Sequence, residues 1–191
     1  LQTFEPAWKI PFPSVPLTMV IERGRDGSSS RIFAEVKNFN GFVVADFKSG
    51  KELQKIEFAD PIKYRFGALK NTSGGKNVTA TEYNPTHGTD ISPDGKILWV
   101  TSRGTNYLYA YSLPDLKLIA HIFLPSRQRP GGGELETGDP HWLVPSPDGK
   151  SLYVGLAHFN SLIVIDTKSM KVVDEIPVGK APKMIDAYAI P

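Results

Sequence analysis

The sequence predicts an all-β protein, a β-propeller of four-stranded antiparallel blades, with three full blades and a partial strand at each end. Two observations carry this prediction. The string Ser-Pro-Asp-Gly-Lys stands at 92–96 and again at 146–150, and the surrounding segments 86–125 and 140–179 align without a gap. Each copy also alternates short aromatic or aliphatic runs with turn residues and shows no sustained helical period. Such units must stack to bury both faces, as propeller blades do.

Each blade is expected to contain four strands, named A to D. In the middle blade the strand-like runs fall near 87–92, 96–102, 106–112 and 117–123. The Asp-Gly pairs at 94–95 and 148–149 predict tight turns, because Gly accepts positive φ and Asp can hydrogen-bond within the turn. A weaker copy at 31–58 lacks the Ser-Pro-Asp-Gly-Lys string. The expected blades are 15–58, 86–125 and 140–179.

The two ends of the chain carry partial copies. Residues 9–11 resemble 175–177, where the last repeat ends. We therefore expect a trailing strand D at 5–11 and a leading strand A at 182–190. The aromatic residues in one shared strand-B position are expected to pack between blades: Phe33, Trp99 and Tyr153.

The segment SPDGKSLYVGLAHFNSLIVIDTKSMKVVDEIPVGKAP, 146–182, and its counterpart 92–125 resemble the YVTN-type β-propeller repeat. The resemblance implies about seven blades, of which this chain would hold the C-terminal three or so. The other blades would come from a second chain, from copies of this chain, or from a longer protein of which this chain is a fragment. The resemblance also implies a secreted protein, periplasmic or extracellular.

Composition excludes several classes. The 22 Lys and Arg nearly balance the 20 Asp and Glu, which argues against a protein built around nucleic acid. The chain has no cysteine, so a disulfide scaffold, a thiolate zinc site and an iron–sulfur cluster are excluded. No apolar run is long enough to span a membrane.

Two D-to-A connections carry insertions, at 59–85 and 126–139, and both are expected on the face at the mouth of the axial channel. Long loops on one face of a rigid scaffold usually serve binding. The larger insertion is either a solvated loop or a clamp for an anion or a partner chain. Its partner-binding candidates are Lys63, Tyr64, Arg65 and Phe66. Its glycosylation candidates, for a secreting eukaryotic source, are Asn71 and Asn77. The smaller insertion is interpreted as a flexible lid or a plain linker.

Three of the four histidines bear on the site. His87 and His141 share the repeat position that begins inner strand A, so both are expected at the channel mouth. The other ligand-binding candidates expected there are Arg103, His158, Trp142 and Lys183. His87 and His141 could ligate copper or zinc, act in acid–base chemistry or anion binding, or simply hydrogen-bond neighbouring backbone. His121 falls on an outer polar position and receives no role.

The sequence therefore favours a secreted or periplasmic scaffold or binding module that assembles with a protein partner or with the rest of its propeller. The alternative is an enzyme with its site at the channel mouth, either a metal-dependent, copper-type oxidoreductase or a lactonase-like hydrolase. No catalytic residue is identified, and no cofactor is required by any motif.

Overall fold

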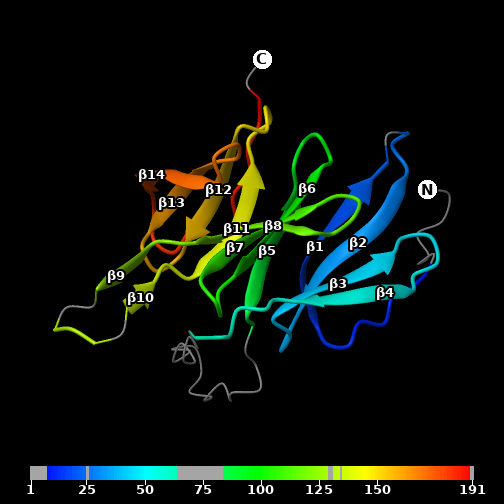
Figure 1. Ribbon diagram of the computed structural model, residues 1–191, viewed down its shortest axis with the longest axis horizontal. Coiled ribbons are helices and arrows are strands. Elements are labelled where there is room, and N and C mark those ends of the chain that lie inside the picture. Colours follow the sequence, from blue (N-terminus) through cyan, green and yellow to red (C-terminus); the bar gives the residue numbers. More distant parts are fainter. Residues whose placement is uncertain (1–7, 25, 64–83, 129–130, 134, 190–191) are drawn as a thin grey trace.

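The computed structural model describes residues 8–24, 26–63, 84–128, 131–133 and 135–189. Its main elements are three four-stranded antiparallel sheets (Figure 1). Blade 1 contains β1 (Pro16–Arg23), β2 (Ser29–Val36), β3 (Gly41–Asp46) and β4 (Glu52–Glu57). Blade 2 contains β5 (Thr86–Ile91), β6 (Ile97–Ser102), β7 (Tyr107–Ser112) and β8 (Leu118–Phe123). Blade 3 contains β11 (Pro140–Pro145), β12 (Ser151–Leu156), β13 (Ser161–Asp166) and β14 (Lys171–Pro177). The predicted fold class is confirmed.

The turns form for the reason that the sequence indicates. In blade 2 the Ser92 hydroxyl donates to an Asp94 carboxylate oxygen at 2.7 Å, and Gly95 has a φ of 71°. Blade 3 repeats this turn, with the Ser146 hydroxyl donating to Asp148 at 2.7 Å. Positive φ is inexpensive only for glycine, so the Asp-Gly pair fixes where strand A turns into strand B.

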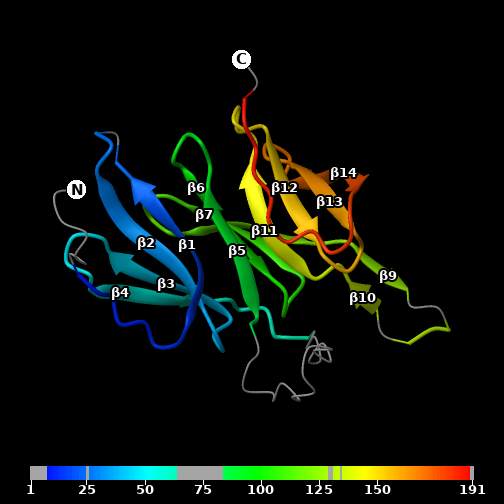
Figure 2. The ribbon, with the colours of Figure 1, turned by 180° about the vertical axis from the view of Figure 1, so that it is seen from behind.

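The first strands of the three sheets lie side by side. β5 packs against β1 on one side and β11 on the other, and Figure 2 shows these three strands next to one another. Each first strand pairs with its second strand with an interruption between its first and fourth residues, and β1 has a second interruption between Ile21 and Arg23. This arrangement makes β1, β5 and β11 the inner strands, and it brings the predicted mouth residues of neighbouring blades together.

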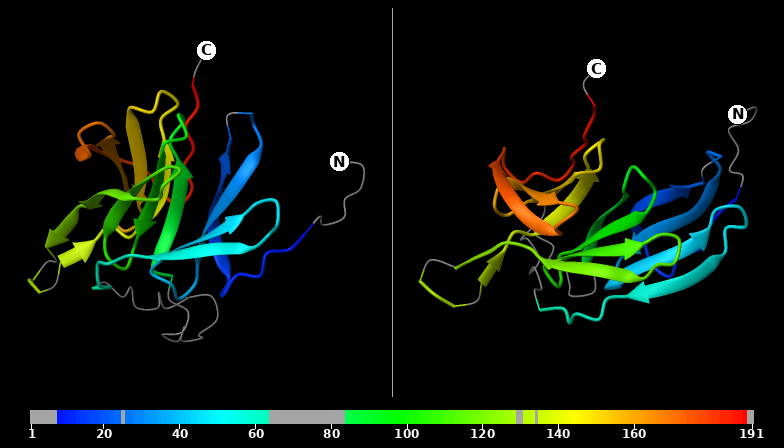
Figure 3. Two further views of the ribbon diagram at one scale, coloured as in Figure 1. Left: turned by 45° about the vertical axis from the view of Figure 1, so that its right-hand side comes forward. Right: turned by 45° about the horizontal axis from the view of Figure 1, so that its top comes forward.

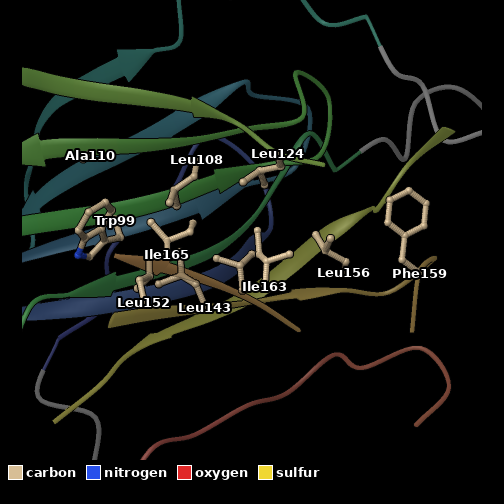
Figure 4. Packing of buried hydrophobic residues seen from close by; sticks show 11 residues of the cluster. Trp99, Leu108, Ala110, Leu124, Leu143, Leu152, Leu156, Phe159, Ile163 and Ile165 are labelled. Carbon is tan, nitrogen blue, oxygen red and sulfur yellow. The ribbon is translucent and has the colours of Figure 1, made fainter. Parts of the chain in front are cut away.

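The hydrophobic core lies in the seams between blades. The seam between blades 2 and 3 contains eleven buried residues, among them Trp99, which is fully buried (Figure 4). Phe33 is fully buried in the corresponding seam between blades 1 and 2. Tyr153, in the same repeat position of blade 3, is only half-buried, because the described residues include no fourth blade to cover it.

The N-terminal segment packs against blade 1 without joining its sheet. Ile10 and Phe12 pack against the outer face of blade 1, where they add to a buried cluster of three residues. Ile56 of β4 packs into the seam between blades 1 and 2 in the equivalent way, and Phe58 is buried there. Neither 8–12 nor 182–189 forms a strand, so the described parts of the expected trailing strand at 5–11 and leading strand at 182–190 are not strands in the structure.

The smaller insertion is not a plain linker, one of the two sequence interpretations. It forms a two-stranded hairpin, β9 (Ser126–Gln128) with β10 (Leu135–Thr137), which extends beyond the blades (Figure 3). Arg127 anchors it by donating to Glu175 at 2.6 Å and lying 4.1 Å above the Phe159 ring. Within the described ranges, no helix has the length and hydropathy that crossing a bilayer requires.

Candidate functional site at the inner strands

Asp139 is the centre of the site. It directly precedes β11, has a φ of 55°, and is 2% exposed. Its Oδ1 accepts a hydrogen bond from Nε of Arg103, which lies in the turn after β6. Its Oδ2 lies 3.0 Å from Nε2 of His141 and 3.6 Å from Nε2 of His158. Asp139 is not among the mouth residues predicted from the sequence, yet it joins three of them and ties blade 2 to blade 3.

The charge of Asp139 is maintained by its partners. Burial alone would raise the pKa of this carboxyl, but the hydrogen bond from His141 and the charge of Arg103 outweigh burial and lower the pKa to about 2. Asp139 is therefore ionised at neutral pH and can only accept hydrogen bonds. It follows that Nε2 of His141 carries a proton, while Nδ1 of His141 is buried and has no hydrogen-bond partner among the described residues.

His87 completes the site from β5. Its ring lies 4.6 Å from the His141 ring and 4.4 Å from the Trp142 ring. Burial and the nearby His141 lower the pKa of His87 to about 4, so this imidazole is neutral at physiological pH. Its Nδ1, like that of His141, is buried without a partner in the described part of the chain. The neutral His87 ring thus lies in contact with the His141 ring, which lies beside the Asp139 carboxylate.

The remaining predicted residues differ in position. Lys183 lies exposed on the C-terminal segment, with no hydrogen bond or ion pair to the Asp139 cluster in the described ranges. Lys63 is exposed, and its backbone N–H donates to the carbonyl oxygen of Gly104 at 2.9 Å. The other loop candidates lie outside the described residues: Tyr64, Arg65, Phe66, Asn71 and Asn77.

A second carboxylate–imidazole pair was missed by the sequence analysis. Asp60, at the start of the larger insertion, lies 3.2 Å from Nδ1 of His121 on β8 and accepts a hydrogen bond from the Tyr109 hydroxyl at 3.1 Å. The Tyr107 ring stacks on His121 at 5.1 Å. The sequence signal was weak, because nothing in the repeat relates Asp60 to strand D of the next blade.

Metal binding by these residues alone is incomplete. No group of three His, Asp or Glu side chains in the described ranges is placed to hold a metal ion. A structural or catalytic zinc site needs at least three protein ligands. The donor set of the described residues therefore does not fit copper or zinc unless other blades contribute.

Comparison with known proteins identifies the architecture. The chain matches a structure of hydrazine synthase from Kuenenia stuttgartiensis with a TM-score of 0.59 and 19% identity, over 95% of this chain and 41% of that one. It matches the WD40 repeats of RRP9 with a TM-score of 0.57 and 16% identity, over 87% and 40%. It matches virginiamycin B lyase from Staphylococcus aureus, in complex with quinupristin, with a TM-score of 0.55 and 15% identity, over 85% and 41%.

The fold is a β-propeller. The chain spans about two-fifths of the length of these propellers, so it is a partial one. No protein-family model and no curated protein matches the sequence, so the YVTN resemblance stays a prediction. At these identities the similarity establishes the fold alone, because one propeller architecture serves many unrelated functions.

Proposed function

We propose that this chain is a scaffold and binding module of a larger propeller, secreted or periplasmic, that works in assembly with further blades. These blades would come from a protein partner, from another copy, or from the rest of its own propeller. The exposed flank of blade 3 carries the proposal. Ile176 and Val178 are 39% and 36% exposed, although Leu124, which is equivalent to Val178, is fully buried. Ile122, which is equivalent to Ile176, packs against the same seam.

The C-terminal segment supports the same conclusion. The carbonyl oxygen of Pro182 lies 3.4 Å from the point where a side chain at Gly155 would begin, so the segment runs beside β12. Figure 2 shows it passing along blade 3. Met184 and Tyr188 are 81% and 79% exposed. An unpaired segment with its apolar side chains in solvent is a suitable contact for an incoming blade.

The location and the loop contacts are further parts of the proposal. The location rests on the resemblance of 146–182 to the YVTN-type repeat, and fractionation of the source cells tests it. The basic and aromatic run at 63–66 is proposed as a second contact with the partner, and Asn71 and Asn77 as glycan sites if the source is eukaryotic.

The assembly is testable by cysteine labelling, because the chain contains no cysteine of its own. Val178→Cys places a single thiol on the flank, and Lys168→Cys places the matched control in an exposed turn of the same blade. Native mass spectrometry of material isolated without chelator identifies partner chains, glycans and bound metal. We expect a complex larger than the 21.0 kDa chain in which the thiol at 178 is protected and that at 168 reacts. A stable monomer in which both thiols react equally would reject the proposal.

A second candidate function is an enzyme with its site at the Asp139 cluster. The observation that favours it is the ordering of His141: Asp139 fixes the proton on Nε2 and leaves Nδ1 as a base. Such a base suits a lactonase-like hydrolase, and a copper-type oxidoreductase would need metal ligands from other blades. Metal analysis of isolated material, with His87→Ala plus His141→Ala as the paired variant, tests the metal version. Lactone hydrolysis lost in His141→Gln tests the other.

A further inference from the structure

A buried carboxyl on β2 departs from the repeat. Glu35 is fully buried, with an exposed fraction of 0%. The equivalent positions of the second and third blades hold Thr101 and Gly155, which are small and cannot ionise. Buried Glu side chains are rare unless they are paired. Glu35 therefore requires a physical explanation that the repeat itself does not supply.

This repeat position joins one blade to the next. In blade 2 the Thr101 hydroxyl donates to the carbonyl oxygen of His141 in β11 at 2.9 Å, which links blade 2 to blade 3. In blade 1 the Glu35 carboxyl occupies the corresponding place beside β5. Thr18 of β1 donates to its Oε2, and the backbone of Gly88 in β5 provides a smaller interaction. Oε1 is buried without a hydrogen-bond partner among the described residues.

No charged group in the described part of the chain compensates the carboxyl. On β1, Glu22 is paired with Arg31, and on β3, Asp46 accepts from the backbone of Ser49. On β5, the His87 ring contacts Trp142 in blade 3. The other titratable groups on these strands are Arg23 and Asp90. Neither they nor another charged group of the described residues contributes to the pKa of Glu35; burial raises it, and hydrogen bonds from Thr18 and the Gly88 backbone lower it.

We propose that Glu35 is a protonated acid at neutral pH that joins blades 1 and 2, and that the seam between them loosens when Glu35 ionises. A buried neutral carboxyl offers both a donor and an acceptor, whereas the ionised form would place an unpaired charge between β2 and β5. Burial is the main cause of a pKa raised to about 8 from the ordinary 4.5. A raised pKa means that the folded form holds its proton more tightly than the unfolded form, so stability falls as pH rises from about 4.5 to about 8.

Glu35→Gln keeps the shape and hydrogen-bonding capacity of the side chain and removes its titration. Glu35→Thr introduces the residue that blade 2 carries in the same position, and it serves if the amide variant folds poorly. Glu57→Gln, at an exposed position of β4, is the control for the loss of one carboxylate. Urea unfolding of the full chain is measured from pH 5 to pH 8, together with hydrogen exchange of the amides in β1 and β5.

We expect the unfolding equilibrium constant of the native chain, divided by that of Glu35→Gln, to rise about tenfold for each pH unit in this range. Amides in β1 and β5 should lose protection over the same range, while those in β12 and β13 should not. Glu57→Gln should behave like the native chain, and Glu35→Thr like Glu35→Gln. Equal pH dependence of the native chain, Glu35→Gln and Glu35→Thr would overturn the proposal, as would loss of protection spread evenly over all blades.

Discussion

The contact between Gly88 and His141 gives a direct test of blade packing. A methyl group added at Gly88 would lie 2.2 Å from the backbone carbonyl oxygen of His141 and 2.8 Å from the Thr101 hydroxyl. The nearest atom is backbone in another blade, so no rotamer change can relieve the clash. Gly88→Ala therefore requires β5 and β11 to separate by about 1 Å, a gap that forfeits roughly a quarter to a half of each attractive contact across it.

The expected cost of Gly88→Ala is about 3 kcal/mol or more, at or above the upper end for overpacked interiors. For a chain of this size such a loss lowers Tm by about 6–12 °C. Gly155→Ala is the matched control, because its methyl group would meet no atom closer than 3.4 Å. We expect it to change stability by less than about 1 kcal/mol. Urea unfolding followed by fluorescence of Trp99, which is buried in the seam, measures both variants. Equal effects of the two substitutions would show that β5 and β11 are not in the described contact.

Three further predictions concern single side chains. Asp139→Asn removes the carboxylate that Arg103 contacts. Because the pKa of Asp139 is lowered to about 2, the native chain should lose about 2 kcal/mol more stability than the variant as pH falls from 4 to 2. His87→Leu introduces the residue that blade 1 carries at this position. Because the pKa of His87 is lowered in the folded chain, the native chain should lose stability as pH falls from 6.5 to 4, and the variant should lose less. The urea midpoints of both proteins, measured across that pH range, test this. Asn106→Ala removes the hydrogen bond of 2.8 Å to the Leu124 carbonyl oxygen and places alanine at a φ of 60°. It should lower the free energy of unfolding, measured in urea, by about 1–3 kcal/mol. Asn106→Gly should lower it less, because glycine accepts positive φ.

The fold could be predicted from the sequence because the repeat supplies the same information several times. A turn such as 92–96 would be ambiguous alone, but its recurrence at 146–150 fixes the strand order and the stacking together. The expected aromatic contacts follow as well: Phe33 and Trp99 are buried in successive seams. The hairpin in the smaller insertion was not predicted, because a segment that occurs once has no repeat to support it.

The site could be predicted only in part. The shared position of His87 and His141 places both on inner strands, and the repeat shows this directly. The central role of Asp139 depends on Arg103, which approaches from another blade, and the distance between blades is not written in any single repeat. Glu35 is visible in the sequence as a departure from Thr101 and Gly155, but its burial follows only from how β5 packs against β2.

One feature of the blades bears on how their insertions vary. The backbone at the exit of each blade is held by an asparagine of that blade's B–C turn: Asn40 through Phe58 and Asp60, Asn106 through Leu124, and Asn160 through Val178 and Ala181. The start of the next inner strand is also held by a hydrogen bond. Before β5, the carbonyl oxygen of Pro85 accepts from the backbone N–H of Gly104. The two backbone positions that an insertion connects are thus held by hydrogen bonds within the blades and do not depend on the residues of the insertion. Doubling its length then adds only about 0.6 kcal/mol of closure entropy, so this face can exchange its peptide segments, by evolution or by grafting, without re-forming the sheets beneath.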